Sequence, residues 1–493
     1  MKSARNRLLA RAAQFCRLVI AGSYRATTAR EWSGNGAFQQ APGREGHAAR
    51  AASLRYRTGT RLAPLVVLAA VIPMLPCLAQ ESPADAHARA KAVREYGKQG
   101  GSDLIPKLAT YLADPDLDVR IEAVKAIVNV GTQYSIDPLI RALGDIDPEI
   151  QIRATDGLVN FYLPGYLTTG GGLTSSLRRA GNAIRSHFTD TNDRVIDPWI
   201  LVRPDVISAL GKVARGGASV DARANAARAI GVLRSRAAIP DLVEALHSKD
   251  SPVIYEALIA LQKIHDPSVA PSITFLLRDL DDKIQAAALE TAGLLQNRDA
   301  LPQVRDAFEH ARSQKVRRSA LEAIALMPDA GVHEVLRNSL GGKDDALRGS
   351  AAEGLGRLKD PSDLPALQQM FDNETKSGPR LGAAFALASM GKLDMTTFGP
   401  LRFLVNNLNL AAWRGVARPY LIELARDPAV RQALYSGLTG ATKDEKTGLA
   451  EVFAASGGAD SIPVLETLSH DPDADVAQAG LRALQAVKAR TAH

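Results

Sequence analysis

The chain has 493 residues, more than one hydrophobic core usually covers, so several domains or an elongated repeat are expected. Aromatic residues make up only 5%, which favours closely packed helices over a β-sandwich. The formal net charge is +7, but 12 of the 60 basic and only 2 of the 53 acidic residues lie in residues 1–79. Residues 80–493 hold the other 48 basic and 51 acidic residues, and so give no general electrostatic reason for nucleic-acid binding.

Residues 1–79 have the pattern of a leader that ends in a signal peptide. An apolar run at 62–75 is preceded by a positive region with Arg55, Arg57 and Arg61. Small residues, Cys77 and Ala79, stand at −3 and −1 of a cleavage site near 79/80. We therefore predict an exported protein of the periplasm or cell envelope. The alternative is that the N-terminal segment stays uncleaved and anchors the chain.

Both cysteines of the chain, Cys16 and Cys77, belong to this leader. The sequence from residue 80 onward therefore contains no disulfide, no cysteine-ligated metal and no cysteine nucleophile.

A repeat begins after residue 100. Prolines with similar apolar surroundings recur every 31 or 32 residues where two repeats are adjacent, and His333 lies in the middle of the 63-residue gap between Pro302 and Pro365. The recurring prolines are Pro106, Pro138, Pro240, Pro271, Pro302, Pro365 and Pro463. A fixed period of this size predicts a solenoid.

Each repeat reads as two helices. The proline suits the first turn of the first helix, because its missing N–H would have no partner there. An aspartate-rich turn such as "ADPDLDVR" then caps an alanine-rich second helix. Gly131 and Gly231 are expected to end their second helices.

These units resemble HEAT repeats of the short bacterial, phycobilisome lyase type. The hallmark is Val-Arg or Ile-Arg at the start of the second helix, here Val119-Arg120 and Ile152-Arg153. Further arginines at equivalent places are Arg223, Arg317, Arg348 and Arg380. The resemblance implies an all-α superhelical solenoid of helix pairs, with structural Asp–Arg ladders between repeats. It also implies that the second helices, the helix B row, line a concave surface to which a partner binds.

The repeat pattern divides the chain after the leader. We expect N-terminal repeats at 80–165, an insertion at 166–203, central repeats at 204–391 and divergent helical repeats at 392–493. The divergent part is richer in large aromatic side chains, including Trp413 and Tyr420, and is interpreted as repeats with larger core residues.

The insertion contains a helical stripe after three glycines. Leu173, Leu177, Ala180, Ile184 and Phe188 fall on one helix face. This helix packs on the solenoid, docks a partner, or lies on a membrane surface through its arginines. Its candidate binding residues are Leu177, Arg178, Arg179, Ile184, Arg185 and Phe188, together with Trp199.

The sequence offers no catalytic constellation. HExxH, Gly-x-Ser-x-Gly and P-loop spacings are absent. His333-Glu334 resembles one of the His-Glu pairs that bind di-iron in deoxyhypusine hydroxylase, but the partner pairs are missing. We therefore predict no catalytic residue, no metal and no cofactor.

The expected function is that of a non-catalytic scaffold of the cell envelope. It would bind a protein partner through the concave helix B face and the segment 169–203, without nucleic acid. The alternative is an envelope protein in peripheral contact with the membrane, and a HEAT-like enzyme comes third.

Overall fold

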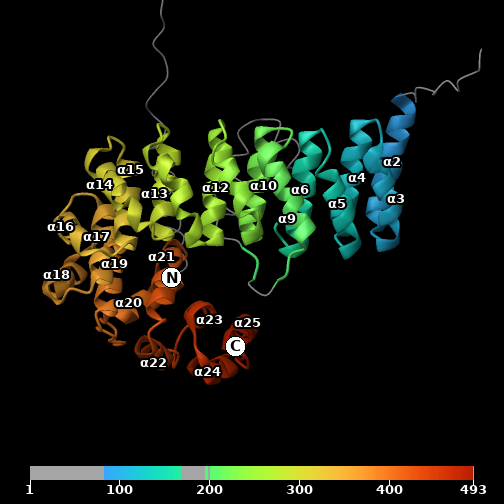
Figure 1. Ribbon diagram of the computed structural model, residues 1–493. Coiled ribbons are helices and arrows are strands. Elements are labelled where there is room, and N and C mark those ends of the chain that lie inside the picture. Colours follow the sequence, from blue (N-terminus) through green and yellow to red (C-terminus); the bar gives the residue numbers. More distant parts are fainter. Residues whose placement is uncertain (1–82, 168–194, 198–199, 492–493) are drawn as a thin grey trace, which may run out of the picture. The chain divides into compact units, whose positions relative to one another are not determined.

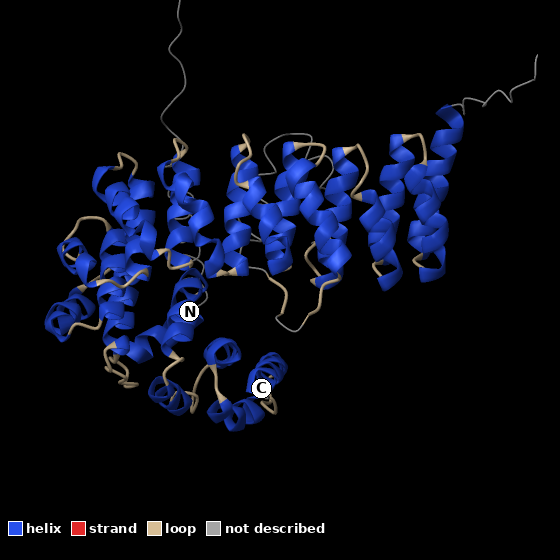
Figure 2. Cartoon of the chain, in the orientation of Figure 1, coloured by secondary structure: helices blue, strands red, loops and turns tan. Residues whose placement is uncertain are grey.

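The computed structural model describes residues 83–167, 195–197 and 200–491. Within these ranges the chain forms helices and no strands (Figures 1 and 2). The helices alternate between two rows, and each helix of the second row packs against the next helix of that row. The predicted all-α solenoid of helix pairs is confirmed.

The second helix of each pair, together with α2 at the start of the described chain, forms the helix B row. Its members are α2 (Pro83–Gln99), α4 (Leu117–Val130), α6 (Pro148–Tyr162), α10 (Val220–Val232), α12 (Ser251–Ile264), α13 (Asp282–Leu294), α15 (Gln314–Leu326), α17 (Asp345–Leu358), α19 (Ser377–Ser389), α21 (Ala411–Leu424), α23 (Lys443–Ser456) and α25 (Ala474–Thr491).

The first helices of the pairs form the helix A row. Its members are α3 (Ile105–Thr110), α5 (Ile136–Ala142), α9 (Pro204–Gly216), α11 (Ile239–Ala245), the 3-10 helix η5 (Pro267–Arg278), α14 (Leu301–His310), α16 (His333–Ser339), α18 (Leu364–Asn373), α20 (Pro400–Asn406), α22 (Pro428–Ser436) and α24 (Ile462–Leu468).

The recurring prolines lie near the starts of the helix A row. The second helical residue is Pro106, Pro240, Pro302, Pro365 or Pro463 in five of these helices. Pro138 is the third residue of α5 and is buried. Pro271 departs from the prediction because it lies inside η5, where 3-10 bonding replaces a regular α-helix.

His333 does not occupy the proline position. It is the first residue of α16, and Glu334 is the second. In the other repeats the first position holds an apolar residue, such as Ile239, Leu301 or Leu364. The second position, which holds proline in α11, α14 and α18, is occupied by Glu334. Placing the repeat position at His333, in the middle of the 63-residue gap, was therefore wrong by one residue.

The repeat arginines lie four residues after the N-cap of the helix B row. Arg120 donates to the carbonyl oxygen of Asp114 over 3.0 Å and to the carboxylate of Asp145 in the next repeat over 2.9 Å. Arg223 pairs with Asp250 at 2.9 Å and Arg348 with Glu374 at 2.8 Å. Arg120 thus joins the turn of its own repeat to the turn of the next, and Arg223 and Arg348 likewise reach an acidic side chain in the turn of the next repeat.

Arg153 is not equivalent to Arg120, which corrects the sequence assignment. Asp147 is the N-cap of α6, so the fourth residue after it is Gln151. The amide of Gln151 donates to the carbonyl oxygen of Asp145 over 2.8 Å, as Arg120 does in its own repeat. Arg153 pairs with Glu149 of its own helix instead. At the same position in α15, Arg317 donates to the carbonyl oxygen of Phe308 over 3.2 Å.

Glycines set the spacing between neighbouring helices of the helix B row. Gly131 ends α4 in the left-handed conformation, as predicted. Gly231 does not end α10: it is buried inside the helix, and a Cβ there would lie 2.6 Å from the Cα of Ala260 in α12. The same contact recurs where Gly293 faces Ala323 and where Gly356 faces Ala386. A side chain at these glycines would force the stacked helices apart.

The leader and most of the insertion lie outside the described residues. None of the described helices has the length and apolarity needed to cross a membrane. The two ends of the insertion are described, and both contact the repeats. At the start, the amide of Leu167 donates to the side-chain oxygen of Asn160 in α6. At the end, the amide of Ile196 donates to the carbonyl oxygen of Val232 in α10, and the amide of Arg203 donates to the hydroxyl of Tyr162 in α6.

Candidate functional site

A polar ladder crosses the helix B row. Each contact of this ladder joins two neighbouring helices of the row. It links the side chain nine residues after the N-cap of the first helix to the side chain six residues after the N-cap of the second. Asn225 donates to Asp156 over 2.9 Å, and Ser319 donates to Glu290 over 2.7 Å. A third contact pairs Arg228 with Glu256 at 3.2 Å, and both of these side chains are buried. The helix B row therefore carries an inter-repeat polar seam within an otherwise apolar stack.

Three successive glutamates continue this seam from α13 to α17. Glu290, Glu322 and Glu353, here called the acidic run, hold the same position in their helices. Glu290 is bonded to Ser319, whereas Glu322 has no hydrogen-bond or ion-pair partner among the described residues. Partial removal of its carboxyl group from water, followed by the charges of Glu290 and Glu353, raises the pKa of Glu322 to about 7, although the side chain still reaches solvent. Within the acidic run, Glu322 is thus the carboxylate that no described residue of the chain pairs with when it is ionised.

A second group of polar residues ties α17 to α21. Arg357 of α17 pairs with Glu353 of its own helix at 2.5 Å and with Glu423 of α21 at 2.7 Å. The hydroxyl of Tyr420 donates to Glu353 over 2.8 Å. Its ring stacks on Phe385 of α19 at 4.7 Å between centroids. Burial, followed by the charge of Glu353, raises the pKa of Tyr420 well above 10. We call Glu353, Arg357, Tyr420 and Glu423 the clasp.

Another polar group lies where the chain enters the insertion. Tyr166 follows α6 and interacts with Arg228, which also pairs with Glu256. Burial and the nearby charge of Asp156 raise the pKa of Tyr166 to about 12. The start of the insertion is therefore fixed to the same polar seam that crosses the helix B row.

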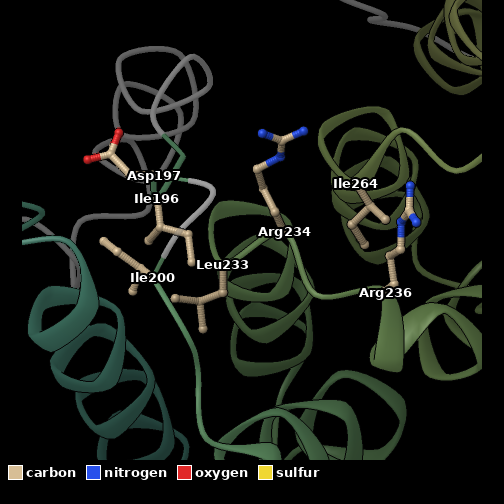
Figure 3. Close-up of a pocket in the computed structure, with 7 residues that line it drawn as sticks. All are labelled: Ile196, Asp197, Ile200, Leu233, Arg234, Arg236 and Ile264. Atoms are coloured by element: carbon tan, nitrogen blue, oxygen red, sulfur yellow. The ribbon is translucent and has the colours of Figure 1, made fainter. Parts of the chain in front are cut away.

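A pocket of about 330 Å³ lies beside the described end of the insertion (Figure 3). Ile196, Ile200 and Leu233 gather on one side of it, while Arg234 and Arg236 bring guanidinium groups. Asp197 and Ile264 complete its lining. The volume of this pocket is at the lower end of the range for ligand sites, and its charged side chains, those of Asp197, Arg234 and Arg236, do not converge on one point (Figure 3).

The predicted binding residues of the insertion are not placed. Leu177, Arg178, Arg179, Ile184, Arg185, Phe188 and Trp199 all lie outside the described residues. Their proposed role stays a prediction.

Sequence reasoning missed the acidic run and the clasp. A signal for the run was present, because Glu290, Glu322 and Glu353 recur at intervals of 32 and 31 residues in "ALETAG", "ALEAIA" and "AAEGLG". The clasp had no such signal, since its partners come from different repeats at unrelated positions.

Comparisons with known proteins agree with the helical repeats. A curated relative, phycocyanobilin lyase subunit alpha of Nostoc sp. strain PCC 7120, is 32% identical over 149 residues. That match takes in 28% of this chain and 54% of the relative, so the chain spans about half the length of the curated relative it matches.

Two solved structures illustrate the similarity in three dimensions. The complex of CpcE and CpcF of phycocyanin lyase from Nostoc sp. PCC 7120 gives 20% identity and a TM-score of 0.35, over 55% of this chain and 93% of that chain. YibA of Escherichia coli gives 16% identity and a TM-score of 0.37, over 63% and 98%.

The family assignment comes from the repeats themselves. The HEAT-repeat family model matches three blocks, residues 73–159, 207–293 and 301–388, which together make up more than half of the sequence. The chain therefore belongs to the HEAT-repeat family.

Proposed function

We propose that this HEAT-repeat chain is a non-catalytic scaffold that binds a basic segment of a partner protein along the acidic run. HEAT repeats typically serve protein–protein interaction, because a stack of helix pairs offers a long, continuous surface. The acidic run adds a chemical preference, since a partner's lysine or arginine would supply the missing positive charge.

One observation carries this proposal: the exposed carboxylate of Glu322 has no ion-pair partner among the described residues. It lies between two further glutamates of the acidic run. Glu353, by contrast, is paired with Arg357. A bound lysine or arginine would relieve the repulsion at Glu322 and so be favoured there over a neutral group.

The remaining parts of the proposal concern segments outside the described residues. We propose that the chain is exported, on the strength of the signal-peptide pattern in 55–79, and that it acts in the cell envelope. The segment 169–203 would add a second contact to the partner or to the membrane. Near the end of this segment, the described residues Ile196 and Arg203 bond to the last residues of α10 and α6.

The test is partner capture by the full chain in its native cells, followed by identification of crosslinked proteins. Glu322→Lys reverses charge in the acidic run, and Glu309→Lys reverses it on α14 of the helix A row. Glu309 is exposed and has a weak pair with Arg305 at 3.8 Å, which makes it a matched control. Circular dichroism would verify that both variants are folded.

We expect one protein to be captured equally by the wild type and Glu309→Lys, and at least tenfold less by Glu322→Lys. The contact should also map to a lysine- or arginine-rich segment of that protein. Equal capture by all three chains would contradict docking on the acidic run. Loss of capture in both variants would point to general charge rather than to this surface.

A further inference from the structure

Two neighbouring repeats depart from the common pattern at positions that touch each other. The first residue of α16 is His333, where other repeats have isoleucine or leucine. The residue just before α18 is Asp363, where other repeats have a small residue such as Ala238, Ala300 or Ser461. The imidazole Nε2 of His333 lies 2.8 Å from Oδ2 of Asp363. The two departures are therefore matched to one another across the repeat boundary.

A third side chain joins this pair. Asp360 is the N-cap of the short 3-10 helix before α18, and one of its carboxylate oxygens accepts the N–H of Ser362 over 2.9 Å. The other oxygen lies 3.8 Å from Nε2 of His333. Within the described part of the chain, His333, Asp360 and Asp363 are the one set of three histidine, cysteine or acidic residues whose ligand atoms all lie within 4.8 Å of one another.

The ion pair with His333 does not account for both carboxylate oxygens of Asp363. Its side chain is 0% exposed, and its Oδ1 atom has no hydrogen-bond partner. Arg337 approaches this atom only to 3.9 Å, and its own side chain is 53% exposed. A buried carboxylate with an unsatisfied oxygen is costly, and two carboxylates face a single imidazole here.

We propose that His333, Asp360 and Asp363 bind a divalent cation of the Zn²⁺ type. Zinc binds imidazole nitrogen and carboxylate oxygen at about 2.0–2.2 Å in tetrahedral geometry, which puts ligand atoms about 3.3 Å apart. The distances of 2.8 and 3.8 Å bracket that value, so small side-chain rotations complete the site. Nε2 of His333 gives up its proton to bind the ion, water takes the fourth position, and the flexible Arg337 side chain turns to solvent.

This cation would join two repeats. Its ligands come from the first turn of α16 and from the turn that leads into α18. Binding would therefore stabilise this boundary of the stack whenever the metal is present. This inference is independent of the acidic run, which belongs to the helix B row.

The experiment is zinc titration of the metal-free full chain by calorimetry, with thermal unfolding measured in parallel. Asp363→Ser and His333→Leu install the residue types that other repeats use at these positions, so both variants are expected to fold. His310→Ala is the control, because His310 is exposed and has a single carboxylate neighbour, Asp306, at 3.1 Å. Circular dichroism would verify folding in every case.

We expect the wild type and His310→Ala to bind one zinc ion with equal affinity and to gain thermal stability from it. Asp363→Ser and His333→Leu should each weaken that binding at least 100-fold and remove the gain. Zinc affinities within twofold of the wild type in both folded variants would overturn the proposal. So would a wild type that binds no zinc.

Discussion

The fourth residue after the N-cap is an arginine in several helices of the helix B row and a glutamine in α6 and α13. Arg348 donates to the carbonyl oxygen of Gly342 over 3.0 Å and pairs with Glu374. Gln285 makes only the carbonyl bond, to Leu277 over 2.9 Å. The bond to the turn carbonyl is thus common to Arg348 and Gln285, and the ion pair is an addition at Arg348.

Arg348→Gln should therefore cost less than Arg348→Ala. The glutamine keeps the bond to the turn and loses the partly buried pair, for about 1 kcal/mol of unfolding free energy, while alanine loses both for about 2 kcal/mol. Urea denaturation of the two variants measures the difference. Equal losses would mean that the ion pair alone matters.

Glu322 should make the stability of the chain depend on pH. Its pKa is raised from 4.5 to about 7, so between these values the folded chain holds a proton that the unfolded chain has lost. This contribution to stability is present below the unfolded pKa and is lost as the pH rises through about 7.

Glu322→Gln removes the negative charge that destabilises the folded chain above about pH 7. At pH 8 we expect the variant to be more stable than the wild type by about 1 kcal/mol, discounted because the side chain reaches solvent. At pH 5 the two chains should be nearly equal in urea denaturation. A gain of the same size at both pH values would show that the charge of Glu322 is not its cause.

At the scale of the helices, glycine has opposite roles at two places in the helix B row. A Cβ at Gly293 of α13 would lie 2.6 Å from the Cα of Ala323 in α15, whereas a Cβ at Gly415 of α21 would meet nothing within 4 Å. Gly293→Ala should destabilise the chain by about 1–3 kcal/mol through overpacking. Gly415→Ala should stabilise it by about 0.5–1 kcal/mol, because alanine favours the helix. Thermal unfolding measures both, and effects of the same sign would refute close packing at Gly293.

The sequence predicted the order of the helices better than it predicted which residue occupies each repeat position within them. The proline period located most of the helix A row, since a helix tolerates proline only in its first turn. Ile152-Arg153 matched the family dipeptide, but the N-cap Asp147 sets the register and places Gln151 at the repeat position. Gly231 matched a helix stop, but its neighbour Ala260 lies 29 residues away in the next repeat, a contact that only packing reveals.

At the scale of the whole stack, the clasp joins helices that are not neighbours. The stability of a solenoid is approximately the sum of the stabilities of its repeats and of the interfaces between neighbouring repeats. Local unfolding of one repeat therefore need not spread beyond the repeats next to it. Arg357 bridges Glu353 of α17 and Glu423 of α21, with α19 between these helices in the row. The clasp should therefore couple the opening of α17 to that of α21.

Arg357→Met tests this coupling, because it keeps the length of the side chain and leaves two carboxylates without their cation. We expect a loss of about 2–3 kcal/mol, since the guanidinium and Glu353 are mostly buried. Hydrogen exchange should become faster in α17 and α21 together and stay unchanged in α4 and α6. Arg418→Met removes the more exposed pair with Glu451 of the adjoining α23 and should cost less than 1 kcal/mol. Faster exchange confined to α17 in Arg357→Met would mean that the clasp bonds do not carry stability across α19, and that the stack behaves as a chain of neighbours throughout.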